Sequence, residues 1–176
     1  MEASPNMNIV KTFQDFMGCA QNKEILAQLD SGKGETVVFS CVVVKINRFG
    51  MKQERTLLLT NMNLYNIKKE SVQRRIGVDS IKSVTRSSKG NSNEFVVHVK
   101  SQYDYRFESE YRKEIFEAIK YVCWKHNKVN LPVYQVPEKL KDFHTTKRDI
   151  SEGNEIDPDE KFRIKDEDIY PEDPSF

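Results

Sequence analysis

Residues 37–59 read VVFSCVVVKINRFGMKQERTLLL and contain two apolar runs separated by a short polar loop. The β-branched first run and the leucines of the second have the composition of buried β-strands. Four cations lie in or beside the loop: Lys45, Arg48, Lys52 and Arg55. Apolar strands need burial, whereas clustered cations need water or an anion. A β-hairpin with a cationic mouth satisfies both needs, and it suggests binding rather than catalysis.

The residues after this hairpin predict further short strands and then one helix. The strand-like segments are LYNIK at 64–68, VQRRIGV at 72–78, residues 81–85, EFVVHVK at 94–100 and residues 103–108. From Ser109 to about Lys125, apolar residues instead recur at helical steps. Seven strands followed by an amphipathic helix resemble the order of the pleckstrin-homology (PH) fold. We therefore expect a mainly β protein with some α structure, a PH-like seven-stranded, partly open barrel or sandwich capped by a C-terminal helix.

Two short helices are expected before the first strand. Apolar residues recur at helical spacing over residues 7–17 and again over residues 23–29. We therefore expect residues 1–32 to form an N-terminal helical segment and residues 33–127 to form the PH-like domain.

The chain after residue 127 loses its periodicity. Five prolines interrupt a polar, acidic stretch: Pro132, Pro137, Pro158, Pro171 and Pro174. We expect residues 128–176 to form an acidic, proline-containing tail, extended or disordered from Leu131 onward. A few apolar residues near its start, including Val133 and Tyr134, could still lie along the domain surface.

The net charge of +1 hides a division along the chain. Residues 1–148 carry a net charge of +9, whereas residues 149–176 carry −8. The basic excess is densest over residues 45–89, with 11 basic and 3 acidic side chains. Such asymmetry indicates an anionic partner. The acidic tail would either dock on the basic segment and inhibit it, or act as a docking strap for a protein.

The cellular compartment is indicated by two missing signals, a membrane-spanning run and a secretory signal, and by the cysteines. No apolar run approaches the roughly 20 residues of a membrane-spanning helix, and MEASPNMN at the N-terminus has no secretory-signal pattern. Cys19, Cys41 and Cys123 are odd in number and widely spaced, which favours reduced thiols over a disulfide framework. We expect a cytoplasmic protein at the periphery of a membrane or on the cytoskeleton.

Five blocks of sequence carry a family resemblance. They are GETVVFSCVVVKINR, KQERTLLLTNMNLYNIK, RRIGVDSIKSVTRS, FVVHVKSQYDYRFES and YRKEIFEAIKY. Together they resemble the tail homology one domain of class I myosins, over about residues 33–125. That family has a PH-like core and binds anionic phospholipids, including phosphoinositides, so the resemblance implies a lipid-binding or adaptor-like module. The sequence has no motor and no GxxxxGK[ST] phosphate loop, so the module is expected to stand alone.

The candidate lipid-binding residues are Lys45, Arg48, Lys52, Arg55 and Arg75. The phosphoinositide signature of the fold is a Lys, a variable gap, then Lys or Arg, one residue, and Arg. Lys45 opens it, but Lys52 and Arg55 are separated by two residues, which favours general anion attraction over stereospecific recognition. Arg74 and Arg75 point to opposite faces of one strand, and Arg75 is predicted to join the site.

Two hypotheses about function follow from these features. The first is a non-catalytic module that binds anionic phospholipids through the basic mouth and links membrane to cytoskeleton, with Phe49 and Met51 dipping into the interface. The alternative is a structural scaffold or adaptor subunit of a large cytoskeletal or ciliary (axonemal) assembly. There, the N-terminal helices and the acidic tail would bind protein partners.

Other functions find less support in the sequence. His98, His126 and His144 are far apart and lack metal-ligand spacing, and His98 is predicted to lie on a strand surface. No nucleophile signature accompanies the carboxylates, so we expect no enzyme activity, no cofactor and no metal. Nucleic acid is not the expected partner, because no RNP-like motif accompanies the basic segment.

Overall fold

The computed structural model describes residues 13–161 of the chain. The strands are β1 (Val37–Ile46), β2 (Lys52–Thr60), β3 (Asn63–Lys68), β4 (Ser71–Gly77), β5 (Ile81–Ser87), β6 (Glu94–Val99), β7 (Tyr105–Glu108) and β8 (Val133–Val136). The α-helices are α1 (Lys23–Leu26), α2 (Arg112–Asn127), α3 (Lys147–Glu152) and α4 (Pro158–Lys161). Short 3-10 helices are η2 (Cys19–Gln21), η3 (Ser31–Lys33), η4 (Val78–Ser80) and η5 (Leu140–Asp142).

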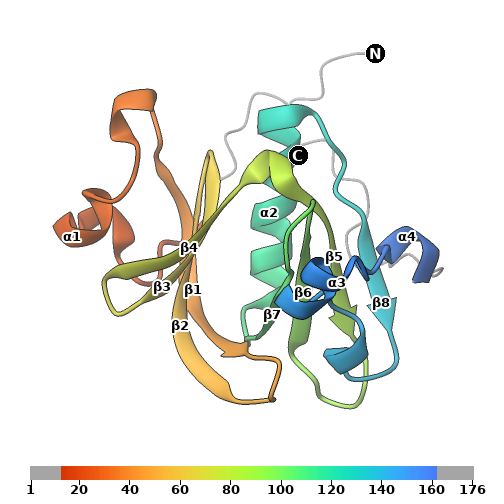
Figure 1. Ribbon diagram of the computed structural model, residues 1–176. Helices are drawn as coiled ribbons and strands as arrows, with labels where there is room; N and C mark the ends of the chain where they lie inside the picture. The colour runs from red at the N-terminus through yellow and green to blue at the C-terminus, as the bar shows by residue number, and fades with distance from the viewer. Residues whose placement is uncertain (1–12, 162–176) are drawn as a thin grey trace, which may run out of the picture.

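The strands form one sheet in the order β4-β3-β2-β1-β7-β6-β5-β8 (Figure 1). Neighbouring strands are antiparallel, except that β5 and β8 run parallel. The predicted hairpin forms, with Cys41 opposite Leu57 and Val43 opposite Arg55. Strands β1–β7 followed by α2 confirm the predicted PH-like fold, and β8 adds an eighth strand to it.

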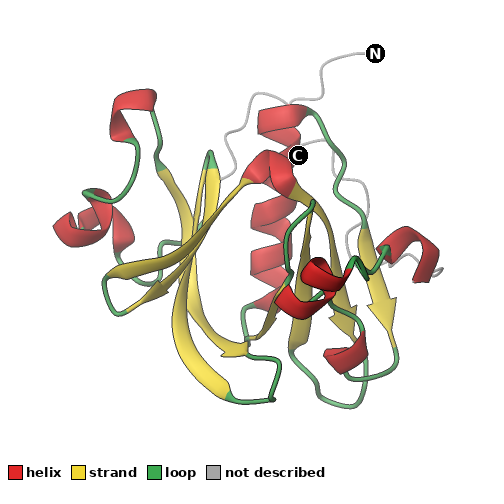
Figure 2. Cartoon of the chain, viewed as in Figure 1, coloured by secondary structure: helices red, strands yellow, loops and turns green. Residues whose placement is uncertain are grey.

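Helix α2 packs on the inner face of the curved sheet (Figure 2). Its side chains at helical spacing, including Phe116 and Ile119, are fully buried there. Alternate residues of the strands meet them, such as Val43, Leu57 and Phe107. This alternation gives one continuous core, because inward residues of a strand recur at every second position.

The outer face of the sheet is covered at both ends by segments that flank the core domain. Residues 19–29, here called the N-terminal cover, place Cys19 and Ile25 on Leu58 and Tyr65. The expected helix over residues 23–29 is therefore present, although α1 is shorter. The expected helix over residues 7–17 lies partly outside the described residues. Its described part is not helical, because Asp15 instead bridges to Ser40 of β1.

Residues 131–156, here called the C-terminal cover, add β8 to the other edge of the sheet and then continue over its outer face (Figure 1). Tyr134, Val136 and Leu140 are buried against Val96. The prediction of an extended or disordered chain was wrong for residues 131–161, which contain β8, η5, α3 and α4. The short apolar run that includes Val133 and Tyr134 outweighs the prolines around it, since burial on β5 and β6 stabilises it.

Two further features of the described residues bear on the predictions. The three cysteines are buried, free thiols, and burial raises the pKa of the Cys41 thiol to about 12. None of the helices within residues 13–161 is long and apolar enough to cross a membrane.

Candidate functional site

The loop between β1 and β2 is held by its own hydrogen bonds. The side-chain oxygen of Asn47 accepts from the N–H groups of Phe49 and Met51, each at 2.9 Å. Gly50 has a φ of 80°, a left-handed conformation that favours glycine. Phe49 is 75% exposed and Met51 is 58% exposed. The loop therefore presents two large apolar side chains to the surroundings.

Lys45 and Arg55 point to the inward face of the hairpin. Arg55 is opposite the buried residue Val43, and Lys45 is two positions from Val43 on the same strand, so the two cations share its face. Both are half-buried. Burial lowers the pKa of the Lys45 ammonium below its usual value of 10.5. Neighbouring positive charges lower that pKa further: Arg55, Lys147 and Arg74.

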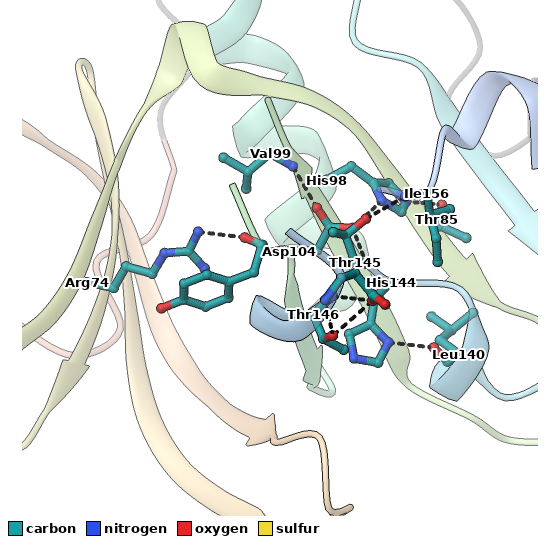
Figure 3. A network of polar contacts seen from close by, with 12 residues as sticks. Arg74, Thr85, His98, Val99, Asp104, Leu140, His144, Thr145, Thr146 and Ile156 are labelled. Atoms are coloured by element: carbon teal, nitrogen blue, oxygen red, sulfur yellow. Dashed lines mark hydrogen bonds and ion pairs between the residues drawn. The ribbon is translucent and has the colours of Figure 1, made fainter. Parts of the chain in front are cut away.

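Strand β4 supplies Arg74 to the same face. Its guanidinium lies over the Tyr103 ring, 3.5 Å from the ring centroid, and 4.5 Å from the centroid of Tyr105. It also donates a hydrogen bond to the Tyr103 carbonyl at 2.6 Å (Figure 3). Among the described residues, Arg74 Nη1 and Arg55 Nε are buried with no hydrogen-bond partner. Three cations thus converge on this face, and two of them have hydrogen-bond donors without a partner. They are here called the mouth cations: Lys45, Arg55 and Arg74.

The other predicted site residues lie elsewhere. Arg48 is exposed on the loop, with its guanidinium 4.6 Å from the centroid of the Phe49 ring. Lys52 forms an ion pair with Glu108 at 3.0 Å, and strand alternation puts Lys52 on the opposite face from Arg55. Arg75 is exposed on the outer face of β4. The structure therefore places Arg74, rather than Arg75, beside Lys45 and Arg55.

A cavity of about 380 Å³ lies beside the hairpin, and Lys45 is the one mouth cation that lines it. The β1–β2 loop forms one wall, and the start of β7 forms another. A third wall is the C-terminal cover, with His144, Thr145 and Lys147. The Lys147 ammonium lies 4.9 Å from the centroid of the Tyr103 ring. Sequence reasoning missed Lys147, because it lies in the segment that was predicted to have no fixed structure.

A buried polar network fixes this third wall (Figure 3). The Asp104 carboxylate accepts hydrogen bonds from the N–H groups of Val99 and Thr145, each at 2.9 Å. The same carboxylate lies 2.9 Å from His98 Nδ1, and His98 Nε2 lies 2.6 Å from the Thr85 hydroxyl. The prediction that His98 lies on a strand surface was wrong, because its side chain is fully buried. Asp104 therefore ties the C-terminal cover to the sheet.

The fold and the inward cations define a PH-like domain with a basic mouth. A family model described as "Unconventional myosin tail, actin- and lipid-binding" matches residues 7–153. Because this match spans most of the sequence, the chain belongs to that family. The match extends beyond the blocks that carry the sequence resemblance, and it includes the N-terminal cover and residues 131–153 of the C-terminal cover. No curated protein matches the sequence.

Solved structures include several similar folds. The hSac2 domain from the human phosphoinositide phosphatase Sac2 is 13% identical, with a TM-score of 0.51, and the match covers 68% of this chain and 86% of that one. The PH domain of human oxysterol binding protein-related protein 11 is 14% identical, with a TM-score of 0.43 and coverage of 53% and 83%. The Slm1 PH domain in complex with D-myo-inositol-4-phosphate is 15% identical, with a TM-score of 0.40 and coverage of 47% and 92%.

Proposed function

We propose that this chain is a non-catalytic, peripheral membrane module that binds anionic phospholipids, phosphoinositides among them, through its basic mouth. The observation that carries the proposal is the convergence of the mouth cations from three strands. None of the three forms an ion pair with another described residue. The family description, which names lipid and actin binding, supports the same reading.

Physical chemistry explains why an anion belongs at this place. Half-buried cations that repel one another are costly, and an anion placed between them removes both the repulsion and the unmet hydrogen bonds. Arg55 and Arg74 can each grip a phosphate with two parallel hydrogen bonds, while Lys45 acts as a point charge. Each further cation near an anionic membrane contributes about 1 kcal/mol, so Arg48 and the outer cations would strengthen binding in a salt-sensitive manner.

The loop residues support an orientation on the membrane. Phe49 and Met51 extend into the surroundings beside the mouth, where aromatic and apolar side chains would enter the headgroup region. In this orientation the mouth cations face the lipid phosphates. Binding would then combine charge attraction with shallow insertion.

Liposome co-sedimentation tests the proposal. The wild-type chain should bind vesicles that contain phosphatidylinositol bisphosphate at physiological salt, and Lys45→Glu with Arg55→Glu should abolish that binding. The matched control is Lys52→Glu with Arg75→Glu, which makes the same change of net charge on the outward face. Circular dichroism would verify that both variants fold. Equal losses in the two variants would refute the mouth as the binding site.

A link to the cytoskeleton is a second, compatible function. The family description includes actin binding, and the N-terminal region exposes two neighbouring apolar side chains. Phe16 is 46% exposed and Met17 is 44% exposed, which is typical of a protein contact. Co-sedimentation with filamentous actin tests this link, and Phe16→Ser with Met17→Ser should weaken it. The alternative of a scaffold subunit in a ciliary assembly would gain support if neither lipid nor actin bound.

A further inference from the structure

The third wall of the cavity comes from a part of the chain far from the hairpin. Thr145 and Lys147 face the β1–β2 loop across the cavity beside Lys45. We infer that this wall completes a pocket for a phosphomonoester group on a polyol, and that Lys147 is a residue that determines selectivity for it. The inference rests on the proposed lipid-binding function and deepens it.

The charges that line the cavity favour such a group. Three cations from two parts of the chain line it: Lys45 and Arg48 of the hairpin, and Lys147 of the C-terminal cover. Arg106 also lines the cavity, but its charge is balanced by an ion pair with Glu94. The one lining carboxylate is Asp104, which is described above as hydrogen-bonded on both oxygens. The charge available to a ligand within the described walls is therefore positive.

The geometry of Lys147 suits recognition of a phosphate. Its side chain is exposed, and its ammonium rests near the Tyr103 ring, where a cation is weakly held. Its positive charge already acts on Lys45 across the cavity. An ammonium has three donors and can turn toward a phosphate at small cost. A volume of about 380 Å³ lies within the range of small-molecule sites.

The wall is fixed before any ligand arrives. Asp104 holds the Thr145 N–H, and the Asp104 N–H donates to the Thr145 carbonyl at 2.8 Å. Next along the chain, Thr146 and Asp149 form a capping box at the start of α3. A wall held in this way loses little entropy when a ligand binds. The cover is therefore expected to supply shape and selectivity, whereas the mouth cations supply general attraction.

Two sources of the phosphomonoester are possible, a lipid headgroup and a soluble phosphate. The test measures binding of soluble inositol trisphosphate, of inorganic phosphate and of two kinds of vesicle by the full chain. One vesicle contains phosphatidylserine, and the other adds phosphatidylinositol bisphosphate. The variants are Lys147→Glu, Lys147→Arg and the matched control Lys141→Glu, an exposed lysine on the same cover that does not line the cavity.

Lys147→Glu should weaken binding of inositol trisphosphate by at least about tenfold, since one charge-assisted contact is lost. Lys147→Arg should retain most of that affinity. Binding to phosphatidylserine vesicles should fall equally in Lys147→Glu and Lys141→Glu, because both make the same change of charge. A preference for inositol trisphosphate over inorganic phosphate, lost only in Lys147→Glu, would assign the pocket to the headgroup.

Three results would overturn the inference without refuting the proposed function. The first is an equal effect of Lys147→Glu and Lys141→Glu on inositol trisphosphate. The second is inorganic phosphate binding as tightly as inositol trisphosphate, which would mean that the pocket does not read the polyol. The third is a wild-type chain that binds vesicles but not the soluble headgroup, which would leave the proposed lipid-binding function intact. Absence of vesicle binding by the wild-type chain would instead refute the proposed function, and with it the pocket.

Discussion

The two covers of the sheet perform the same structural task but differ in what else they reach. The N-terminal cover buries Cys19 and Ile25 on β2 and β3, and the cavity beside the mouth includes none of its residues. The C-terminal cover buries Tyr134 and Leu140 and continues directly into the wall of that cavity. A segment that completes a fold can therefore also complete a binding site, when it passes beside the cavity.

Each cover is also fixed by an aspartate. Asp15 accepts hydrogen bonds from the N–H groups of Cys19 and Ala20, each at 2.9 Å, and from the Ser40 hydroxyl at 2.5 Å. Asp104 plays the same part for Thr145. The difference is burial, since Asp15 remains partly exposed whereas Asp104 is buried. Loss of the buried Asp104 carboxylate is therefore expected to destabilise the protein more than loss of the Asp15 carboxylate.

Removal of a whole cover should have the largest effect on folding, and it should distinguish the two covers most clearly. A chain that ends at Asn130 loses β8 and a set of buried apolar side chains: Leu131, Val133, Tyr134, Val136 and Leu140. Each buried side chain of this kind contributes about 1.5–3 kcal/mol, and their sum rivals the stability of a whole domain. We expect this chain to be unfolded at room temperature by circular dichroism. A chain that begins at Leu29 keeps all eight strands and should stay folded, so equal loss in both would contradict the asymmetry.

Single core substitutions should show the same order with smaller effects. Tyr134→Ala should cost about 4 kcal/mol and Ile25→Ala about 2 kcal/mol, since both side chains are buried but the tyrosine leaves the larger cavity. Urea denaturation measures both. Val129→Ala is the control, because that valine is 43% exposed and its loss should change little. A larger loss from Ile25→Ala would reverse the ranking of the two covers.

The helix caps offer a finer comparison. Asn22 caps α1 by accepting from the Ile25 N–H, and Thr146 caps α3 by accepting from the Asp149 N–H. Asn22→Ala and Thr146→Ala should each cost about 1 kcal/mol of unfolding free energy. Only Thr146→Ala should also weaken binding of inositol trisphosphate, because its helix begins at the cavity wall. Equal binding of inositol trisphosphate by both variants would show that the C-terminal cover does not contribute to the site.

The central part of the fold could be predicted because its sequence is regular. The alternation in residues 37–59 and the helical steps around Phe116 both reflect burial on one face. Lys45 and Arg55 were predicted from their positions at the end of one hairpin strand and the start of its partner, and they do share the inward face. Arg74 was passed over, although it shares a face with Ile76, and that signal of a cation on an apolar face was available.

The C-terminal cover could not be predicted in the same way. Its strand has only four residues, Val133–Val136, which is too short to show a period. Its prolines are typical of a loop, and its position on β5 is a parallel pairing between residues far apart in sequence. The contact of Thr145 with Asp104 likewise depends on tertiary structure alone. Lys147 could therefore not be predicted as a site residue from the sequence.

Acidification should destabilise the C-terminal cover and not the N-terminal cover, and this is the smallest of the expected effects. His144 is buried in the C-terminal cover, where its Nδ1 lies 3.1 Å from the Leu140 carbonyl. Burial lowers the pKa of His144 below its usual 6.5, and nearby Arg106 adds to this lowering. The Leu140 carbonyl and the carboxylates of Asp104 and Asp149 oppose the shift without reversing it. The folded protein therefore favours neutral His144.

The sign of the pH effect follows from this lowered pKa. As pH falls below about 6.5, the unfolded chain binds a proton that the folded cover excludes, so stability decreases until the folded pKa is passed. Hydrogen exchange between about pH 7.5 and 5.5 should show reduced protection of the Thr145 N–H and unchanged protection of the Ile25 N–H, since residues 19–29 contain no histidine. His144→Gln should abolish the difference. Loss of protection at both sites, or its persistence in the variant, would assign the effect to other groups and remove pH as a means of loosening the cavity wall selectively.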